Sequence, residues 1–201
     1  MDLNLRGRTA IITGSSQGIG LEIARRLVEE GANVTLCARD ESRLRAAEAE
    51  LKLLSLKVVA ESANLESMED CQRVVRRTAE VFRGIDILVN NVGGIARFAP
   101  FEELGEEDWI ACFRLNLLSA VHATRASLPW LLKSPAPAIV NIASITGAQP
   151  GDYNPHYSSM KAGLINLSKH LSKPLRLTGL LENWTELRIP CLTWNFSFGC
   201  S

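Results

Sequence analysis

Along most of this chain, short apolar segments alternate with longer amphipathic ones. Continuously apolar runs that are rich in β-branched residues and bounded by turn residues predict buried strands at 9–13, 33–37, 57–62, 85–91 and 138–143. Segments with helical periodicity lie between them, at 21–30, 41–53, 68–82 and from 106 to about 133. Strands that alternate with crossover helices are typical of a parallel sheet covered on both faces. The pattern therefore predicts an α/β fold with a doubly wound parallel sheet.

The periodic pattern stops near residue 173. The chain has 201 residues, of which 46% are hydrophobic, enough for one buried core. We assign residues 1–173 to a single domain and expect Pro174 to end its last helix. Residues 174–201 hold many aromatic side chains but no clear periodicity, so we treat them as an atypical C-terminal tail.

Charge and cysteine content narrow the function classes. Lys and Arg total 22 and Asp and Glu total 22, without long runs of one sign, which disfavours a nucleic-acid groove or an anionic membrane surface. No apolar segment is long enough for a signal peptide or a spanning helix, so a cytoplasmic location is predicted. The five cysteines lack C-x-x-C spacing, which predicts reduced thiols and no metal site.

A glycine-rich turn, TGSSQGIG, joins the first predicted strand to the first helix. Its glycines are Gly14, Gly18 and Gly20. Side chains at these positions would keep the backbone away from a pyrophosphate, and a helix N-terminus attracts anions. The turn predicts a dinucleotide phosphate site, although a purely structural connection is the alternative.

The end of the second strand bears on which dinucleotide binds. An acidic residue there would bond to a ribose 2′-hydroxyl and repel a 2′-phosphate, but this sequence has Ala38 followed by Arg39. Because an arginine pairs well with phosphate, NADP(H) is the preferred cofactor, with NAD(H) possible. Alternatively, Arg39 is a solvated loop charge and Asp40 only caps the next helix.

A tyrosine and a lysine with helical spacing form the candidate chemical centre. Tyr157 and Lys161 would share one helix face, Ser144 follows the last predicted strand, and Asn116 lies in the long preceding helix. Together with TGSSQGIG and NNVGG at 90–94, these motifs resemble the short-chain dehydrogenase/reductase family, in the style of its 3-oxoacyl carrier-protein reductases. The resemblance covers residues 5 to about 173 and implies a Rossmann-like fold.

The resemblance implies an oxidoreductase that interconverts a carbonyl compound and a secondary alcohol. Tyr157 would be general acid in reduction and general base in oxidation, and Lys161 would lower its pKa and hold the nicotinamide ribose. Ser144 would bind the substrate oxygen, and Asn116 would hold a water that links Lys161 to solvent. The alternatives are that Tyr157 is a packed aromatic, Lys161 a solvated helix residue and Asn116 an ordinary polar residue.

The resemblance also implies which residues bind the cofactor. They are Gly14, Ser16, Gln17, Gly18, Ile19, Gly20, Arg39, Asn64, Asn91, Gly93, Tyr157 and Lys161. Two positions depart from the family pattern, since Val92 stands where alanine is usual and Asn64 where aspartate is common. An amide oxygen still accepts a hydrogen bond, so adenine contact at Asn64 is weakened in charge only.

The family continues beyond the catalytic helix with further strands and a substrate loop, which residues 174–201 do not resemble. We therefore expect a sheet without the family's last strands, whether the tail is a natural ending, a truncation or a change of reading frame. The alternative functions are a dinucleotide-binding protein with little turnover or a partner subunit. The resemblance further implies a homo-oligomer formed through the helices around 106–133 and 157–173.

Overall fold

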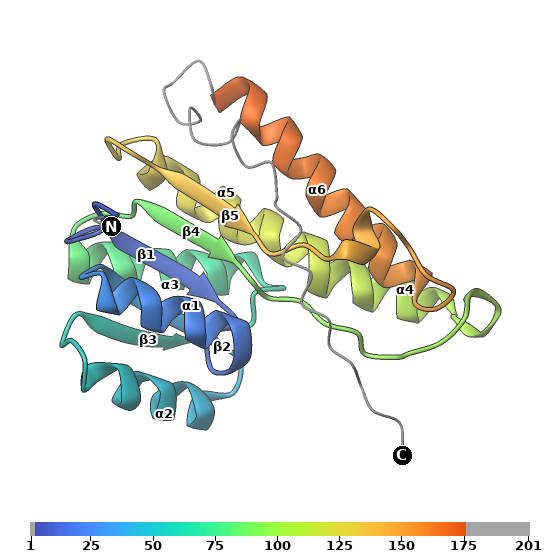
Figure 1. Cartoon of the computed structure of the whole chain (residues 1–201), viewed down its shortest axis with the longest axis horizontal. Coiled ribbons are helices and arrows are strands. Elements are labelled where there is room, and N and C mark those ends of the chain that lie inside the picture. Colours follow the sequence, from blue (N-terminus) through green and yellow to red (C-terminus); the bar gives the residue numbers. More distant parts are fainter. Residues whose placement is uncertain (1–2, 176–201) are drawn as a thin grey trace.

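A computed structural model describes residues 3–175 of the chain, in which a parallel sheet lies between layers of helices (Figure 1). The strands are β1 (Thr9–Thr13), β2 (Asn33–Ala38), β3 (Val58–Ser62), β4 (Ile87–Asn90) and β5 (Ala138–Asn141). Within the described residues they form one sheet in the order β3-β2-β1-β4-β5, with parallel pairing throughout. The doubly wound α/β prediction is therefore confirmed.

The strand order reverses at the centre of the sheet. From β1 the chain winds outward through β2 and β3, and it then crosses back to place β4 on the other side of β1. Ile11 of β1 is accordingly paired with Thr35 on one side and with Leu88 on the other. In such sheets the crevice beyond the carboxyl ends of the two diverging strands is where ligands bind. The topology thus directs attention to the loops after β1 and β4.

Helices cover both faces of the sheet. They are α1 (Gly18–Glu29), α2 (Glu41–Lys52), α3 (Met68–Phe82), α4 (Glu106–Phe113), α5 (Ser119–Leu131) and α6 (Pro155–Leu175). Alternate residues of β1 face opposite cores: Ile12 packs in the cluster that includes α1 and α2, and Ile11 packs in the one that includes α3 and α5. Burial on both faces explains why the strands are apolar without interruption.

Local capping chemistry sets two of the helix starts where the sequence predicts them. The Asp40 side chain accepts a hydrogen bond from the Arg43 amide at 3.0 Å at the start of α2. The Ser67 hydroxyl accepts one from the Asp70 amide at 3.3 Å at the start of α3. Each bond satisfies an amide that a helix N-terminus leaves without an intrahelical partner.

Several predicted boundaries shift in the folded chain. Helix α1 begins at Gly18, inside the glycine turn, rather than at 21, and β4 ends at Asn90 because the amide of Asn91 donates to the Thr13 hydroxyl instead of to a strand. The predicted helix from 106 to 133 is interrupted by a π turn at Arg114–Leu118. Helix α6 runs to Leu175, so Pro174 lies in its last turn and does not end it, as terminal residues of helices vary by one or two.

The expectations for the tail fall outside this description. Residues 176–201 lie beyond the described part of the chain, which leaves the expected loss of the family's last strands without a test. Among residues 3–175, β5 has β4 as its strand neighbour and no strand pairs with its other edge. None of the described helices is both long enough and apolar enough to cross a membrane.

Candidate active site

The glycine turn lies at the carboxyl end of β1 and leads directly into α1. Gly14 and Gly18 adopt positive φ angles of 65° and 60°, a conformation that favours glycine. A Cβ added at Gly18 would meet nothing within 4 Å, so its backbone faces open space. Gly20 has another function, because a Cβ there would lie 2.4 Å from the Gly14 carbonyl oxygen and 2.5 Å from Nδ2 of Asn91. Gly20 thus lets α1 pack closely against the turn instead of facing the cavity.

Asn91, from the loop after β4, ties that loop to the glycine turn. Its side-chain amide donates to the carbonyl oxygens of Thr13 and Gly14 at 2.9 and 3.0 Å. The Thr13 hydroxyl accepts in return from the backbone amides of Asn91 and Val92 at 2.8 and 3.0 Å. The two loops that meet at the reversal of strand order are therefore held in one arrangement.

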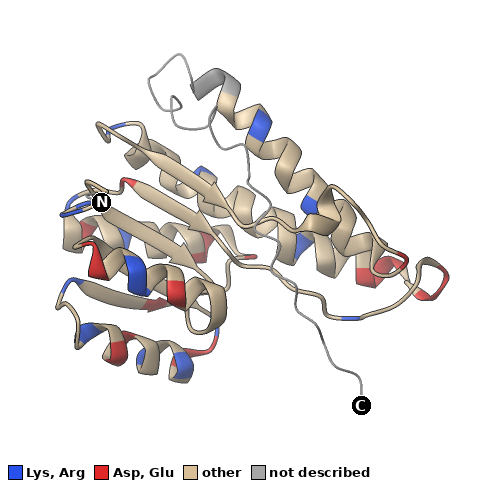
Figure 2. Cartoon of the chain, in the orientation of Figure 1, with Lys and Arg blue, Asp and Glu red and all other residues tan. Residues whose placement is uncertain are grey.

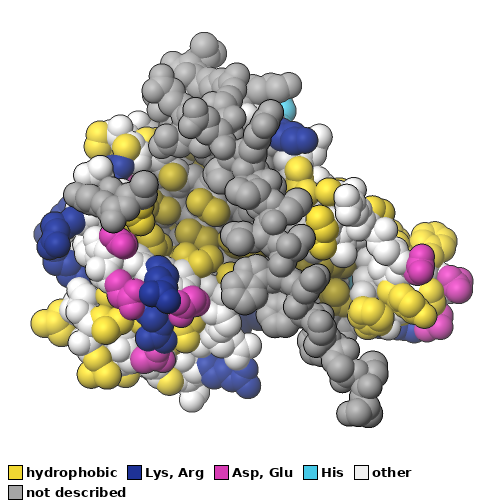
Figure 3. All heavy atoms as spheres, in the orientation of Figure 1, with side chains coloured by type: hydrophobic (Ala, Val, Ile, Leu, Met, Phe, Trp, Pro, Cys, Tyr) yellow, Lys and Arg dark blue, Asp and Glu magenta, His cyan; other side chains and the backbone are white. Residues whose placement is uncertain are grey.

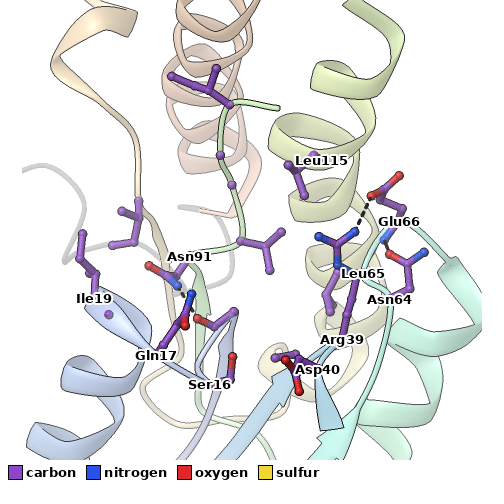
Figure 4. Close-up of a pocket in the computed structure, with 18 of the residues that line it drawn as sticks. Ser16, Gln17, Ile19, Arg39, Asp40, Asn64, Leu65, Glu66, Asn91 and Leu115 are labelled. Atoms are coloured by element: carbon purple, nitrogen blue, oxygen red, sulfur yellow. Dashed lines mark hydrogen bonds and ion pairs between the residues drawn. The ribbon is translucent and has the colours of Figure 1, made fainter. Parts of the chain in front are cut away.

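A cavity of about 700 Å³ opens beyond these loops, within the range of about 300–1,000 Å³ typical of ligand sites (Figure 4). Most of the residues predicted to bind the cofactor line it: Gly14, Ser16, Gln17, Gly18, Ile19, Arg39, Asn64, Asn91, Gly93, Tyr157 and Lys161. Its walls also include residues that were not predicted, among them Arg43, Leu65, Glu66 and Leu115. The folded chain therefore brings the glycine turn and the Tyr157–Lys161 pair to one cavity.

Arg39 extends into solvent at one end of this cavity, with 66% of its side chain exposed. Its Nη1 lies 3.8 Å from Oε1 of Glu66, and Figure 4 shows the two side chains directed toward each other. Arg43 lies close to the same end, where its Nη1 donates to Oε1 of Gln17 at 2.9 Å. Arg43 was not predicted as a site residue, although the sequence places it one helical turn after Arg39, a spacing that could have indicated it.

Asn64 lines the same end of the cavity, but its side chain is already engaged. Oδ1 of Asn64 accepts a hydrogen bond from the Glu66 amide at 3.2 Å, and the Asn64 amide donates to Oδ2 of Asp70 at 2.7 Å. This oxygen is the group expected to contact adenine. Any such contact would share the oxygen with the Glu66 amide.

Tyr157 and Lys161 lie one turn apart near the start of α6, as their spacing predicts. Nζ of Lys161 is 5.6 Å from the centre of the Tyr157 ring and donates to the Ile142 carbonyl oxygen at 2.8 Å. Lys161 is only 3% exposed, and it lines the cavity together with Tyr157. The burial of Lys161 disagrees with the alternative that it is a solvated helix residue. The half-buried phenol of Tyr157 beside it disagrees with the alternative of an ordinary packed aromatic.

Burial dominates the proton affinity of both groups. It raises the pKa of the Tyr157 phenol, and the hydrogen bond with Ser144 opposes this rise only in part. Burial also lowers the pKa of the Lys161 ammonium. The pKa of the Tyr157 phenol is therefore raised, and not lowered as expected, in this arrangement, in which the ammonium lies over the ring and donates to Ile142. The phenol is protonated at neutral pH.

Ser144 lies between β5 and a short 3-10 turn at Ile145–Gly147. Its hydroxyl accepts from the Thr146 amide at 3.3 Å and lies 2.9 Å from Oγ1 of Thr146. The hydrogen bond to Tyr157 places Ser144 beside the phenol. Ser144 is thus brought to the predicted centre, held by the turn that follows it.

Asn116 is fully buried in the π turn. Its Nδ2 donates to the carbonyl oxygens of Gly94 and Cys112 at 2.9 and 3.1 Å, and its Oδ1 accepts from the Gly94 amide at 2.9 Å. The side chain thereby joins the π turn to the loop after β4. These bonds use both donors of the side-chain amide and one acceptor position of Oδ1, and the expected role of Asn116 in holding a water stays a prediction.

The π turn itself is stabilised by a side chain. The Ser119 amide bonds to the Arg114 carbonyl, five residues back, which releases the Leu115 carbonyl from the usual helical pattern. The Ser119 hydroxyl donates to that Leu115 oxygen at 2.5 Å. Wider turns of this kind often occur at functional sites, and here the turn contains Asn116.

Gly93 makes room for the buried polar groups. A Cβ at this position would lie 2.8 Å from Oδ1 of Asn116 and 2.9 Å from Nζ of Lys161. The sequence suggested that Gly93 lets the backbone approach a cofactor. The structure adds that the absence of a side chain at Gly93 leaves the space in which the side chains of Lys161 and Asn116 approach the loop.

The described residues contain no cluster of three or more His, Cys, Asp or Glu side chains that is suited to a metal ion. Cys37, Cys71 and Cys112 are buried free thiols, and burial raises the pKa of each. They are protonated at neutral pH.

Comparison with known proteins identifies the family. Residues 8–183 match the short chain dehydrogenase family. The chain is 32% identical over 181 residues to a 3-oxoacyl-[acyl-carrier-protein] reductase of Vibrio cholerae, a match that covers 90% of this chain and 72% of the relative.

Solved structures agree with this assignment. L-Sorbose reductase from Gluconobacter frateurii, in complex with NADPH and L-sorbose, superposes with a TM-score of 0.85 at 34% identity, covering 90% of this chain and 68% of the other. A short chain dehydrogenase/reductase from Burkholderia phymatum in complex with NAD gives 0.82 at 25% identity, with 87% and 62% covered. The chain belongs to the short-chain dehydrogenase/reductase family of oxidoreductase enzymes.

Proposed function

We propose that this enzyme interconverts a carbonyl compound and a secondary alcohol with NADP(H), using Tyr157 as general acid and base. The observation that carries the proposal is that Tyr157 and Lys161 line the same cavity as the glycine turn. A proton donor and a phosphate-binding turn then lie within reach of one bound dinucleotide. The alternatives, a binding protein with little turnover or a partner subunit, make different predictions in the assay below.

The residues of the cavity fit a nicotinamide dinucleotide. The open backbone at Gly18 and the start of α1 suit a pyrophosphate. Lys161 uses one donor on Ile142, which leaves two N–H donors for ribose hydroxyl groups. When bound, the nicotinamide supplies or accepts the hydride.

Tyr157 and Ser144 act on the substrate oxygen in this proposal. The raised pKa keeps Tyr157 protonated at neutral pH, so in reduction it donates its proton to the oxygen of the carbonyl group. Ser144, hydrogen-bonded to the phenol, holds the same oxygen. In the reverse direction the phenolate accepts the proton of the alcohol. Gly94 and Asn116 fix the loop opposite Lys161 through their paired hydrogen bonds.

The preference for NADP(H) rests on two arginines. Arg39 is largely exposed at the cavity edge, and Arg43 lies one turn away, so both reach toward a 2′-phosphate. The Glu66 carboxylate near Arg39 acts against a phosphate and limits the preference. We expect Arg39→Ala to weaken NADPH binding and leave NADH binding nearly unchanged. Arg45→Ala, on α2 and bonded to Glu48, is the matched control.

The test is NADPH oxidation with a panel of ketones and 3-oxoacyl thioesters, run with wild type and Tyr157→Phe. Loss of turnover with retained NADPH binding in the variant supports the enzyme. Ser159→Ala removes an exposed hydroxyl two residues away on α6 and should not change the rate. Wild-type protein that binds NADPH but turns nothing over would favour the binding protein with little turnover, and binding of neither cofactor would favour the partner subunit.

We also propose that the chain forms a homo-oligomer through the helices around 106–133 and 157–173. Ile110 and Phe113 on α4 are about 40% exposed and provide apolar area for such a contact. Light scattering after gel filtration should give a mass above that of one chain. Phe113→Glu should shift that mass toward the monomer.

A further inference from the structure

Two aromatic rings, one from the loop after β4 and one from the loop before α6, stack on each other and remain open to solvent. The centres of the Phe98 and Tyr153 rings are 5.3 Å apart, with their planes inclined by 23°. Phe98 is nevertheless 71% exposed and Tyr153 55% exposed. Two adjacent exposed rings form a small apolar patch, and such patches occur where a ligand or partner binds.

Both rings belong to segments that lead into the catalytic cavity. Phe98 follows two residues after Ala96 in the loop that lines the cavity from Gly93 onward. Tyr153 precedes Tyr157 by four residues, a reach of at most about 14 Å along the chain. Arg39 and Glu66 line the cavity from the loops after β2 and β3, whereas Ala96 and Tyr157, the lining residues nearest in sequence to the rings, line it from the loop after β4 and from α6.

A clamp between the two segments holds the ring pair in place. The Asn154 amide donates to the Ala99 carbonyl oxygen at 2.9 Å, and the Ala99 amide donates to Oδ1 of Asn154 at 3.1 Å. Asn154 and Ala99 are both buried, and Asn154 has a positive φ of 58°. A strained, buried residue that is bonded twice to one partner fixes the geometry of its neighbours. Phe98 and Tyr153 flank this clamp, immediately before α6.

Neighbouring apolar side chains extend the surface that the rings present. Ile95, which lines the cavity, is 41% exposed, and Ile145, directly after Ser144, is 59% exposed. Figure 3 shows hydrophobic side chains gathered with acidic ones at the end of the molecule that carries α4. A substrate that reaches Tyr157 from this side meets apolar area.

The charges around the rings are mostly negative. We call residues 97–108 and residue 152, which lie near the two rings in the sequence, the acidic rim (Figure 2). Its acidic members are Glu102, Glu103, Glu106, Glu107, Asp108 and Asp152. Arg97 is the one basic residue of these positions, and it pairs with Asp108 at 3.2 Å and Glu103 at 3.9 Å. A surface of this sign repels anions and does not disfavour neutral molecules.

We propose that the substrate is an uncharged carbonyl compound or alcohol that carries a flat apolar ring, which packs against the Phe98–Tyr153 pair. The inference rests on the proposed function and specifies the substrate class of the same site. A ring adds an offset or edge contact to a pair that is already stacked, and the acidic rim excludes carboxylates. Small ketones without a ring reach Tyr157 without using the pair.

The experiment compares acetophenone with butanone in NADPH oxidation, for wild type, Phe98→Ala and Tyr153→Ala. With acetophenone, kcat/KM should fall about 3- to 10-fold in each variant, the value of one aromatic contact. With butanone it should stay within the error of wild type. Phe101→Ala, an exposed aromatic that contacts Trp109 edge-on, is the control and should change neither substrate. Equal losses on both ketones, or none on acetophenone, would overturn the proposal.

A second comparison changes the charge of a ketone that has no ring, at the cost of one added methyl group. Methyl acetoacetate should be reduced with a higher kcat/KM than acetoacetate, and Asp152→Asn should narrow the difference. A preference for the carboxylate would contradict the proposed class.

Binding measurements separate this inference from the proposed function. Acetophenone is titrated calorimetrically into protein saturated with NADP⁺, in which no reduction occurs. Binding that weakens in Phe98→Ala supports the ring site even if no ketone is turned over, in which case only the proposed function fails. Turnover of butanone without any dependence of acetophenone binding on Phe98 would reject the ring site alone.

Discussion

Gly93→Ala tests whether Lys161 depends on the empty space beside the loop after β4. The added Cβ would lie 2.8 Å from Oδ1 of Asn116 and 2.9 Å from Nζ of Lys161, whereas ordinary contact begins at 3.4 Å. One of these groups must therefore move by about 0.5 Å or more. Asn116 is held by hydrogen bonds to Gly94 and Cys112, so the flexible end of Lys161 is the group that yields.

The magnitude follows from what Lys161 loses. Its ammonium donates to Ile142 at 2.8 Å, and a hydrogen bond to a charged group contributes about 1.5–3 kcal/mol. A misplacement near 1 Å of a catalytic group costs about 100-fold in rate. We expect kcat to fall by about 10- to 100-fold, and overpacking to lower the free energy of unfolding by about 1–3 kcal/mol.

The assay is steady-state reduction of a ketone by NADPH, with thermal unfolding measured on the same samples. Gly84→Ala is the control, since a Cβ there would meet nothing within 4 Å and Gly84 does not line the cavity. It adds the same methyl group away from Lys161 and should leave kcat near wild type. Wild-type kcat in Gly93→Ala, or an equal loss in Gly84→Ala, would refute the assignment of this space to Lys161.

Three further predictions follow from other parts of the site. Gly20→Ala should lower the free energy of unfolding by about 1–3 kcal/mol in thermal melts, because its Cβ would meet the backbone oxygen of Gly14 at 2.4 Å. Gly84→Ala, whose Cβ would meet nothing within 4 Å, is the control and should leave that free energy nearly unchanged. The rate of alcohol oxidation should rise as pH increases from 7 toward 10, while ketone reduction stays flat, because oxidation needs the Tyr157 phenolate and burial raises the pKa of that phenol; an oxidation rate independent of pH would argue against Tyr157 as the base. Glu66→Gln should tighten NADPH binding about 2- to 5-fold and leave NADH unchanged in fluorescence titrations, because it removes a partly exposed carboxylate 3.8 Å from Arg39.

Much of the fold was readable because it depends on local signals. All of the predicted strands exist, and the first, Thr9–Thr13, has the predicted boundaries. Capping at Asp40 and Ser67 involves residues only three positions apart in the chain. Periodicity and capping report on such short-range geometry, and a parallel sheet follows once apolar strands alternate with helices.

Contacts between distant segments were not readable in the same way. The close approach of Gly20 to Asn91 joins α1 to the loop after β4, and the bond from Arg43 to Gln17 joins α2 to the glycine turn. The π turn likewise involves a distant segment, because Asn116 within it is hydrogen-bonded to Gly94 in the loop after β4. No pattern among neighbouring residues in the sequence indicates which loops meet where the strand order reverses.

The sequence by itself determined the order of strands and helices, the glycine turn and the spacing of Tyr157 and Lys161, because each depends on neighbours along the chain. The tertiary structure alone decided the environment of these groups. Burial raised the pKa of Tyr157 and lowered that of Lys161, contrary to the simple expectation from their adjacency. The tertiary structure also created the space beside Gly93 and left the rings of Phe98 and Tyr153 exposed. Solvation and packing depend on every segment that folds around a side chain, so the sequence next to that side chain determines neither of them.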